Sequence, residues 1–357
     1  MPGYLSEMCP AGYNDKLVVY LARNPRQFTS AHFPQTIIIS LGFCIGEMSS
    51  CVSGIAPGLF CRMRWLILTI FGSLSIELPA EESPRAAPGE RRVYKQSGGE
   101  DRGLELFFPP DRKPGSRAPG LILFHGGGWR GGSPRQFRET CAYFASRGLV
   151  CATAEYRMLN EAEQAELPEG ESRKRVCIAD AKSAIRWMKR HADKLGVDPD
   201  RIVAGGGSAG AHISALATLN PGLDDPSDPI DSTEIDTSVV AYLWFNPAFS
   251  PEDAGDPEVN VLNFVEKGLA PALVFFGTED WWLGGWNTAH ARWREAGNKS
   301  IHLRFAEGEK HGFFTKEPWR SITLVEADRF LAELGLIDGP PTREDPSTEE
   351  VRLRWAE

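Results

Sequence analysis

Short apolar runs alternate with longer amphipathic stretches over most of the chain after residue 118. The runs predict buried strands, and two further short strands precede them. Apolar residues at three- and four-residue spacing predict helices between the strands. Strand followed by helix, several times over, is typical of an α/β fold with a mainly parallel central sheet and helices on both faces. The expected strands are 92–95, 104–108, 121–125, 150–156, 202–205, 239–245, 273–277 and 301–305, and the expected helices are 135–147, 173–195, 209–217, 286–296 and 319–334.

The first 80 residues lack this alternation. Residues 1–62 hold few charges, and Pro, Gly and Ser interrupt their apolar runs. We interpret them as a doubtful, disordered leader, an over-translation upstream of a true start at Met63. Residues 63–80 combine a Met, an Arg, an apolar core and a final Ala80, which is typical of a secretory signal peptide. The core is too short to span a bilayer. We therefore expect a secreted or periplasmic protein.

Cleavage after Ala80 would leave a single large α/β domain at 81–337 and a tail at 338–357. The full length of 357 residues by itself suggests two domains, but subtracting the leader and signal leaves enough chain for one. The tail is acidic and contains Pro, and we expect it to be mobile.

The amino-acid composition limits the classes of partner, metal and cofactor that we expect. The net charge of −9 and the absence of a long basic run argue against nucleic acid. Neither His-x-x-x-His nor Cys-x-x-Cys occurs, so we expect no metal and no cofactor. Three of the seven cysteines follow Ala80, and a Cys141–Cys177 disulfide stays open on the sequence alone. The oligomeric state stays open as well.

The strongest chemical signal is a Gly-x-Ser-x-Gly pentapeptide from Gly206 to Gly210, between the strand 202–205 and the helix 209–217. A sharp strand-to-helix turn needs neighbours without side chains, and it presents the central hydroxyl at the carboxyl end of the sheet. The helix N-terminus there favours developing negative charge. We predict that Ser208 is a nucleophile.

A second signal is the run His-Gly-Gly-Gly-Trp at 125–129, directly after the strand 121–125. Glycines leave backbone N–H groups unobstructed, so this loop can hold an oxyanion. A phosphate-binding Walker loop is excluded because no Gly-Lys-Ser/Thr follows.

A serine hydroxyl needs a base, and the base needs an acid that orients it. His311 lies in a loop after the strand 301–305, where a base is well placed. Glu279 and Asp280 follow the strand 273–277, and Asp280 is preferred, with Glu279 a competitor. We interpret His125 as structural and His212 as a packing or capping residue.

Four motifs in this order, at 125–129, 206–210, 277–280 and 310–313, resemble the α/β-hydrolase superfamily, within it the hormone-sensitive-lipase-like and acetyl-esterase branch. The resemblance covers about residues 92–336. It implies that Ser208, Asp280 and His311 form a catalytic triad. It also implies an oxyanion hole formed by Gly127, Gly128 and the amide of Ala209. Another similar motif is Ala-Glu-Tyr-Arg at 154–157, and we interpret Arg157, with Asp180, as a scaffold ion pair.

The implied activity is hydrolysis of carboxylic esters through an acyl-enzyme. Only a short stretch precedes the glycine loop, without a convincing long helix, so we expect a minimal or absent cap and an open site. Such a site suits short acyl groups, or acetyl and feruloyl groups on polysaccharide.

The tryptophans near the motifs either stack on sugar rings or pack the core. The alternatives are a prolyl-oligopeptidase-like serine peptidase and a non-catalytic binding protein on the same scaffold. The tryptophans are Trp129, Trp281, Trp282 and Trp286.

Overall fold

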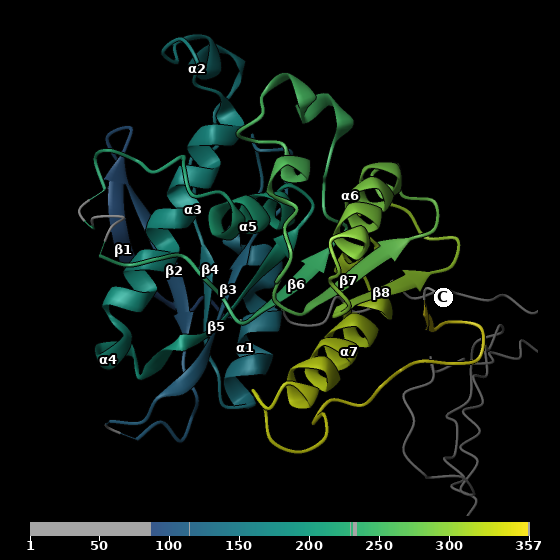
Figure 1. Ribbon diagram of the computed structural model, residues 1–357. Helices are drawn as coiled ribbons and strands as arrows, with labels where there is room; N and C mark the ends of the chain where they lie inside the picture. Colours follow the sequence, from purple (N-terminus) through teal and green to yellow (C-terminus); the bar gives the residue numbers. More distant parts are fainter. Residues whose placement is uncertain (1–86, 114, 229, 231–233, 356–357) are drawn as a thin grey trace, which may run out of the picture. The chain divides into compact units, whose positions relative to one another are not determined.

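One mixed sheet organises the chain, with the strand order β1-β2-β4-β3-β5-β6-β7-β8-β9 (Figure 1). The computed structural model describes residues 87–113, 115–228, 230 and 234–355, which belong to one compact unit from residue 83 to residue 357. The six central strands pair in parallel, and β1, β2 and β9 pair antiparallel at the edges. The strands are β1 (Glu90–Ser97), β2 (Glu100–Phe107), β3 (Ala118–Phe124), β4 (Val150–Ala154), β5 (Val197–Gly207), β6 (Ala241–Phe245), β7 (Ala272–Gly277), β8 (Ile301–Ala306) and β9 (Leu353–Trp355).

The helices connect successive strands, as expected for parallel neighbours. Each predicted helix occurs, although 173–195 is divided at His191 into two helices. The short helix α2 was not predicted; Asn160 and Glu163 form a capping box at its N-terminus. The helices are α1 (Arg138–Ser146), α2 (Glu161–Ala165), α3 (Arg173–Arg190), α4 (Ala192–Leu195), α5 (Ala209–Leu219), α6 (Leu283–Glu295) and α7 (Trp319–Glu333).

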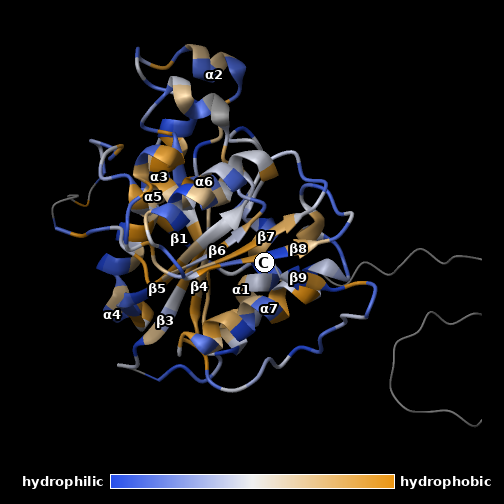
Figure 2. Ribbon diagram, turned by 45° about the vertical axis from the view of Figure 1, so that its right-hand side comes forward, coloured by the Kyte–Doolittle hydropathy of each residue, from blue (hydrophilic) through white to orange (hydrophobic). Residues whose placement is uncertain are grey.

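Two apolar cores lie on the two faces of the sheet. In β3, Ile122 and Phe124 join the core that also contains residues of α3, α5 and α6. Leu121 and Leu123 of the same strand join the core that contains residues of α1 and α7. Because alternate strand residues point to opposite faces and both faces are covered, the central strands are mainly apolar, and Figure 2 shows them mainly in orange to white. This explains why continuous apolar runs predicted these strands.

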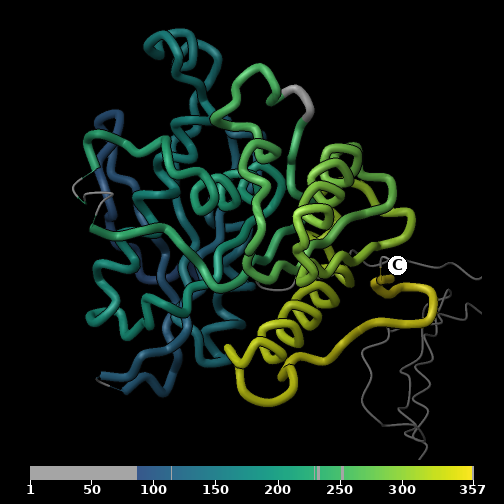
Figure 3. Tube along the Cα trace, in the orientation of Figure 1, coloured from purple at the N-terminus to yellow at the C-terminus, as the bar shows by residue number. Residues whose placement is uncertain are grey.

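The C-terminal segment is held against the rest of the unit. After α7 the chain loops past the end of that helix and returns to the sheet edge at β8 (Figure 3). Arg343 pairs with Glu139 of α1 at 2.7 Å, and β9 pairs antiparallel with β8. The structure thus gives this segment an ion pair and a strand pairing, and the mobility expected from the sequence stays a prediction. Two of its charged residues have ion-pair partners on the helices, Arg343 on α1 and Asp345 on α7.

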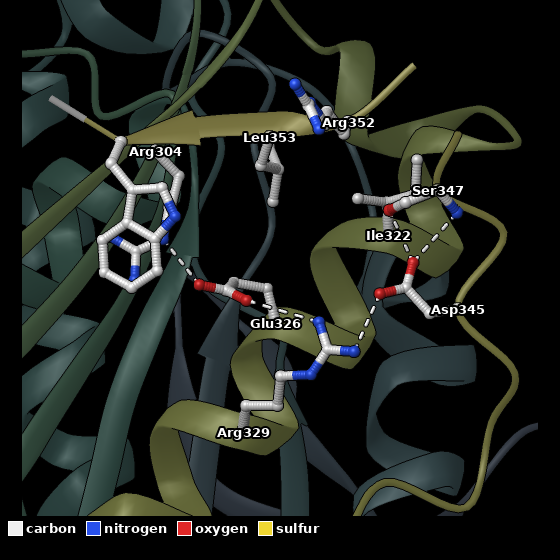
Figure 4. A pocket seen from close by; sticks show the side chains of 9 residues that line it. Arg304, Ile322, Glu326, Arg329, Asp345, Ser347, Arg352 and Leu353 are labelled. Atoms are coloured by element: carbon white, nitrogen blue, oxygen red, sulfur yellow. Dashed lines mark hydrogen bonds and ion pairs between the residues drawn. The ribbon is translucent and has the colours of Figure 1, made fainter. Parts of the chain in front are cut away.

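Charged side chains anchor the same segment around a pocket of about 290 Å³ (Figure 4). Arg304 of β8 pairs with Glu326 of α7 at 2.5 Å, and its guanidinium lies 3.4 Å from the ring centroid of Trp355. Arg329 pairs with Asp345 at 2.9 Å. None of the predicted site residues lines this pocket. The pocket is therefore part of the attachment of the segment to α7 and β8.

Several predictions concern residues outside the described part. The leader at 1–62 and the signal peptide at 63–80 both lie there, so they and the secreted or periplasmic location stay predictions. Among the described residues, no helix is long and apolar enough to cross a membrane.

The described cysteines are all free thiols. Cys141 on α1 packs in the core on one face of the sheet, whereas Cys177 on α3 packs in the core on the other face. The disulfide that the sequence left open between them therefore does not form. Burial raises the pKa of both thiols well above the ordinary value, which leaves them poor nucleophiles.

Candidate active site

Ser208 sits on a sharp turn between β5 and α5, as the pentapeptide predicted. Its backbone has φ 54° and ψ −118°, a strained conformation for a residue with a side chain. A Cβ on Gly206 would lie 2.3 Å from the carbonyl oxygen of Phe124, and one on Gly210 would lie 1.9 Å from it. Only glycine permits so close an approach of the turn to β3. The two glycines thus allow the conformation that presents the serine hydroxyl.

The structure brings the three predicted triad residues into one hydrogen-bonded line. The Oγ of Ser208 lies 2.8 Å from Nε2 of His311, and Nδ1 of His311 lies 2.9 Å from Oδ2 of Asp280. His311 follows β8 and Asp280 follows β7, and the two strands are neighbours in the sheet. The imidazole is only 15% exposed and the carboxylate is fully buried. This geometry can transfer a proton from the hydroxyl to the imidazole.

Of the two candidate acids, Asp280 is the one whose carboxylate contacts His311. Glu279 is exposed, and its carboxylate lies 3.9 Å from the ammonium of Lys310. Asp280 also accepts a hydrogen bond of 2.9 Å from the backbone N–H of Trp282. These contacts fix one carboxylate oxygen toward His311.

Asn246 is a member of the site that the sequence analysis missed. It directly follows β6, has a positive φ of 50° and is fully buried. Its Nδ2 donates a hydrogen bond of 2.6 Å to Oδ2 of Asp280. A signal was present, because a polar residue at the end of a buried strand next to the serine's strand is well placed for a site. We call Ser208, His311, Asp280 and Asn246 the Ser208 line.

The glycine loop after β3 lies against the serine turn. A Cβ on Gly126 would be 3.2 Å from the Cβ of Ser208. Gly127 and Gly128 both have positive φ, 133° and 62°, and their N–H groups donate to no acceptor among the described residues. Ala209 is the first residue of α5. Unpaired donors beside a nucleophile suit an oxyanion, and the role of these three amides stays a prediction.

His125 is a buried, neutral residue beneath this loop. Its Nδ1 lies 2.8 Å from the carbonyl oxygen of Gly126, its ring stacks on Tyr156, and the Tyr156 hydroxyl donates to the His125 carbonyl at 2.6 Å. Its Nε2 is buried without a partner among the described residues. Burial lowers the pKa of His125 to about 4, since a proton on Nε2 would have no acceptor. The contacts agree with the structural role expected for His125.

The predicted scaffold ion pair occurs within a larger cluster. Arg157 contacts both carboxylate oxygens of Asp180, at 2.8 Å through Nη2 and 3.0 Å through Nε. The buried Lys95 lies 2.8 Å from Asp180 and 2.7 Å from Asp225, and Arg157 also pairs with Asp225 at 2.9 Å. We call these four residues the Asp180 cluster. Each charge in it faces an opposite charge, which is typical of a structural network.

The four tryptophans near the motifs divide into two kinds. Trp286 is fully buried and Trp129 is 8% exposed, and both belong to the apolar core. Trp282 packs partly buried against that core. Trp281 differs, because it is 70% exposed and its ring centroid lies 4.7 Å from that of His311. Only Trp281 thus offers an open aromatic face beside the candidate base.

The side chains gathered here suit acyl transfer. Among the described residues no group of three or more His, Cys, Asp or Glu side chains could hold a metal ion. The site instead combines a hydroxyl, an imidazole, a carboxylate and free backbone N–H groups at the carboxyl ends of neighbouring strands. The fold and this site define an α/β-hydrolase.

Comparison with known proteins agrees with this class. The family model BD-FAE matches residues 104–242. Esterase 2 of Thermogutta terrifontis, in its apo form, is 34% identical, and the match covers 72% of this chain and 99% of that one with a TM-score of 0.64. The chain belongs to the α/β-hydrolase superfamily, to the group whose named members are esterases.

Two curated relatives come from Mycobacterium tuberculosis. Esterase LipQ is 31% identical over 50% of this chain and 42% of its own length. Esterase LipC is 34% identical over 54% of this chain and 48% of its own length. The chain thus spans less than half of the length of these two relatives.

Proposed function

We propose that the protein hydrolyses carboxylic esters by a two-step acyl transfer. The observation that carries this proposal is the hydrogen-bonded line from Ser208 through His311 to Asp280, with 2.8 Å and 2.9 Å contacts. Such a line activates a hydroxyl that is otherwise a weak nucleophile. The esterase names of the relatives support the same reaction class.

In the first step, Nε2 of His311 accepts the proton of Ser208 while Oγ attacks the ester carbonyl carbon. The carbonyl oxygen becomes an oxyanion, and the N–H groups of Gly127, Gly128 and Ala209 are the donors we propose for it. His311 then gives its proton to the departing alcohol. In the second step, water attacks the acyl-enzyme with His311 again as base, and the free acid leaves. Asp280 orients the imidazole throughout and stabilises its positive charge.

We propose short-acyl esters, and acetyl or feruloyl groups linked to polysaccharide, as substrates. Structures of the Thermogutta esterase are described as bound to propionate and to butyrate, which supports a short acyl group. No helix precedes β3 in the described residues from 87 onward, which supports an open site. The exposed face of Trp281 beside His311 supports a ring on the alcohol side, because His311 passes its proton to that side.

The reaction class is tested with Ser208→Ala. The purified wild-type protein should hydrolyse p-nitrophenyl acetate and butyrate, and Ser208→Ala should lower kcat by at least about 10⁴-fold because the nucleophile is gone. Paraoxon, which phosphorylates the Thermogutta esterase, should label the wild type and not the variant, as read by mass spectrometry. Retained turnover or labelling in the variant would remove Ser208 from the proposal, and turnover of peptides instead of esters would replace the reaction class.

The substrate class is tested separately with a panel of esters. Acetylated xylan, a feruloyl ester of a pentose, short p-nitrophenyl esters and an emulsified long-chain triglyceride are compared by kcat/KM. We expect the short and carbohydrate-linked esters to be preferred. A preference for the triglyceride would contradict the proposed substrates while leaving ester hydrolysis in place.

A further inference from the structure

Trp129 ends the glycine loop in an unfavourable conformation. Its φ is +60°, which is uncommon for a bulky residue and has to be held by its surroundings. It directly follows Gly128, whose N–H is one of the proposed oxyanion donors. The orientation of that donor therefore depends on what fixes Trp129.

A hydrogen bond ties the Trp129 ring to the helix that carries the serine. Nε1 of Trp129 donates to Nδ1 of His212 at 3.3 Å, and Nε2 of His212 lies 2.9 Å from the carbonyl oxygen of Val259. These partners require the tautomer with the proton on Nε2. His212 is fully buried, so both ring nitrogens are used in a site closed to solvent.

A second set of contacts involves the face of the Trp129 indole. The ammonium of Lys174 lies 4.1 Å from the Trp129 ring centroid, and Lys174 pairs with the buried Asp253. Asp253 in turn lies 3.4 Å from Nε2 of His212. The indole is thus held by a cation on its face and an imidazole at its edge.

The proposed oxyanion hole has donors on two separate segments. Gly127 and Gly128 belong to the loop after β3, and Ala209 opens α5. His212 lies three residues after Ala209 on the same helix, one turn away, and Trp129 lies one residue after Gly128. A contact between His212 and Trp129 therefore spans both halves, and donors must be placed to within about 0.5 Å to act on a transition state.

We propose that the Trp129–His212 hydrogen bond is a positioning contact that sets the spacing of the two halves of the oxyanion hole. Neither residue touches the reacting atoms; both act through the neighbouring amides. The inference rests on the proposed ester hydrolysis. Since an oxyanion exists only after attack, loss of the contact should affect the transition state and leave binding of the ester unchanged.

The test removes the donor and the acceptor of this hydrogen bond in separate variants and then restores an acceptor. Trp129→Phe keeps an aromatic ring near Lys174 and removes the N–H donor together with part of the buried ring volume, a loss that Trp293→Phe shares. His212→Leu removes the acceptor, and His212→Asn returns an oxygen near the position of Nδ1. We expect Trp129→Phe and His212→Leu each to lower kcat for p-nitrophenyl acetate about tenfold, with KM within twofold of wild type. The double variant should lose no more activity than either single variant, because both changes break the same bond. His212→Asn should recover most of the loss in kcat.

Two further measurements separate positioning from folding. Trp293 is a fully buried tryptophan whose Nε1 has no partner among the described residues, so Trp293→Phe is the matched control and should keep kcat. The affinity for a trifluoromethyl ketone, which mimics the tetrahedral state, should fall with kcat, and the affinity for the acid product should not. Unfolding temperatures are recorded for every variant.

The results distinguish a failure of the proposed ester hydrolysis from a failure of the proposed positioning contact. Wild-type protein without ester turnover would overturn the proposed function. Wild-type turnover with kcat unchanged in Trp129→Phe and His212→Leu would overturn the positioning contact alone, as would a raised KM at constant kcat. An equal loss in Trp293→Phe, or ketone and product affinities that fall together, would also overturn it.

Discussion

The Asp180 cluster and the Ser208 line are both largely buried polar networks built around an aspartate, but they are organised in opposite ways. In the cluster, two cations face two carboxylates and each charge is neutralised. In the line, one carboxylate faces an imidazole and an amide, and the line ends at a hydroxyl on a strained backbone. Burial and short contacts alone therefore do not mark a reactive site. The reactive site differs because the Ser208 hydroxyl at the end of the line is available to a substrate, whereas each charge in the Asp180 cluster is already paired.

The largest expected effect is on the free energy of unfolding, and it tests whether the Asp180 cluster stabilises the fold. Asp180→Asn keeps the shape of the side chain but removes a buried charge that balances Lys95 and Arg157. We expect the free energy of unfolding to fall by about 4 kcal/mol, because unbalanced buried charges are costly. Urea unfolding at pH 7 measures it.

Ser208→Ala is the matched control for that experiment. It should leave the free energy of unfolding within about 0.5 kcal/mol of wild type, or raise it by relieving strain, while activity is lost. Asp180→Asn should keep kcat per folded molecule within about twofold. Equal stability of the two variants would break the distinction between the networks.

A second prediction concerns acid and the buried His125. Its pKa is about 4 in the folded protein against an ordinary 6.5, so the unfolded chain binds more protons between these values. The stability that His125 contributes is complete above pH 6.5 and is lost as pH falls through about 4. The loss should be on the order of 3 kcal/mol.

Urea unfolding between pH 4 and 7 measures this loss against His125→Asn, which has no titrating ring. The variant should be less stable at pH 7, and its stability should depend less on pH across the window. Parallel curves for the two proteins would show that His125 is not the titrating group.

The smallest expected effect concerns the missed member of the Ser208 line. Asn246→Leu keeps the size of the side chain and removes the amide that donates to Asp280. We expect kcat to fall about tenfold, because a hydrogen bond to a charged acceptor contributes about 1.5 kcal/mol. Steady-state kinetics with p-nitrophenyl butyrate measures it.

Asn298 offers the control, since it is another buried asparagine but its side chain binds the backbone of Gly268 and Leu269. Asn298→Leu should lower the unfolding temperature and keep kcat. Equal kcat losses in the two variants would remove the special role of Asn246.

The sequence predicted most of the fold because local signals and the tertiary structure agree. Mainly apolar runs identified all six central strands, since most of their residues are covered on both faces. The short strand β9 was missed because three residues carry too little pattern, and they pair with β8, which lies far away in the sequence. Charge composition suggested mobility in a segment where Arg343 and Asp345 have ion-pair partners on α1 and α7.

The candidate site was predictable where backbone geometry restricts the residue type. Gly206 and Gly210 are required by the close approach to β3, so the serine between them could be identified from spacing. Asn246 acts through a single side-chain contact with Asp280, and an asparagine after a strand is also common in ordinary turns. The choice between Glu279 and Asp280 likewise needed the direction in which each side chain points.

The pairing of β9 with β8 also bears on aggregation. Without β9, the six residues of β8 would present an unpaired sheet edge, next to the loop that carries His311. Such an edge can recruit a strand from another molecule. β9 pairs with Arg304, Phe305 and Ala306, the half of β8 that leads into this loop, and Arg354 and Trp355 on its outer side are exposed. The short strand therefore shortens the edge of β8 that is open to such pairing.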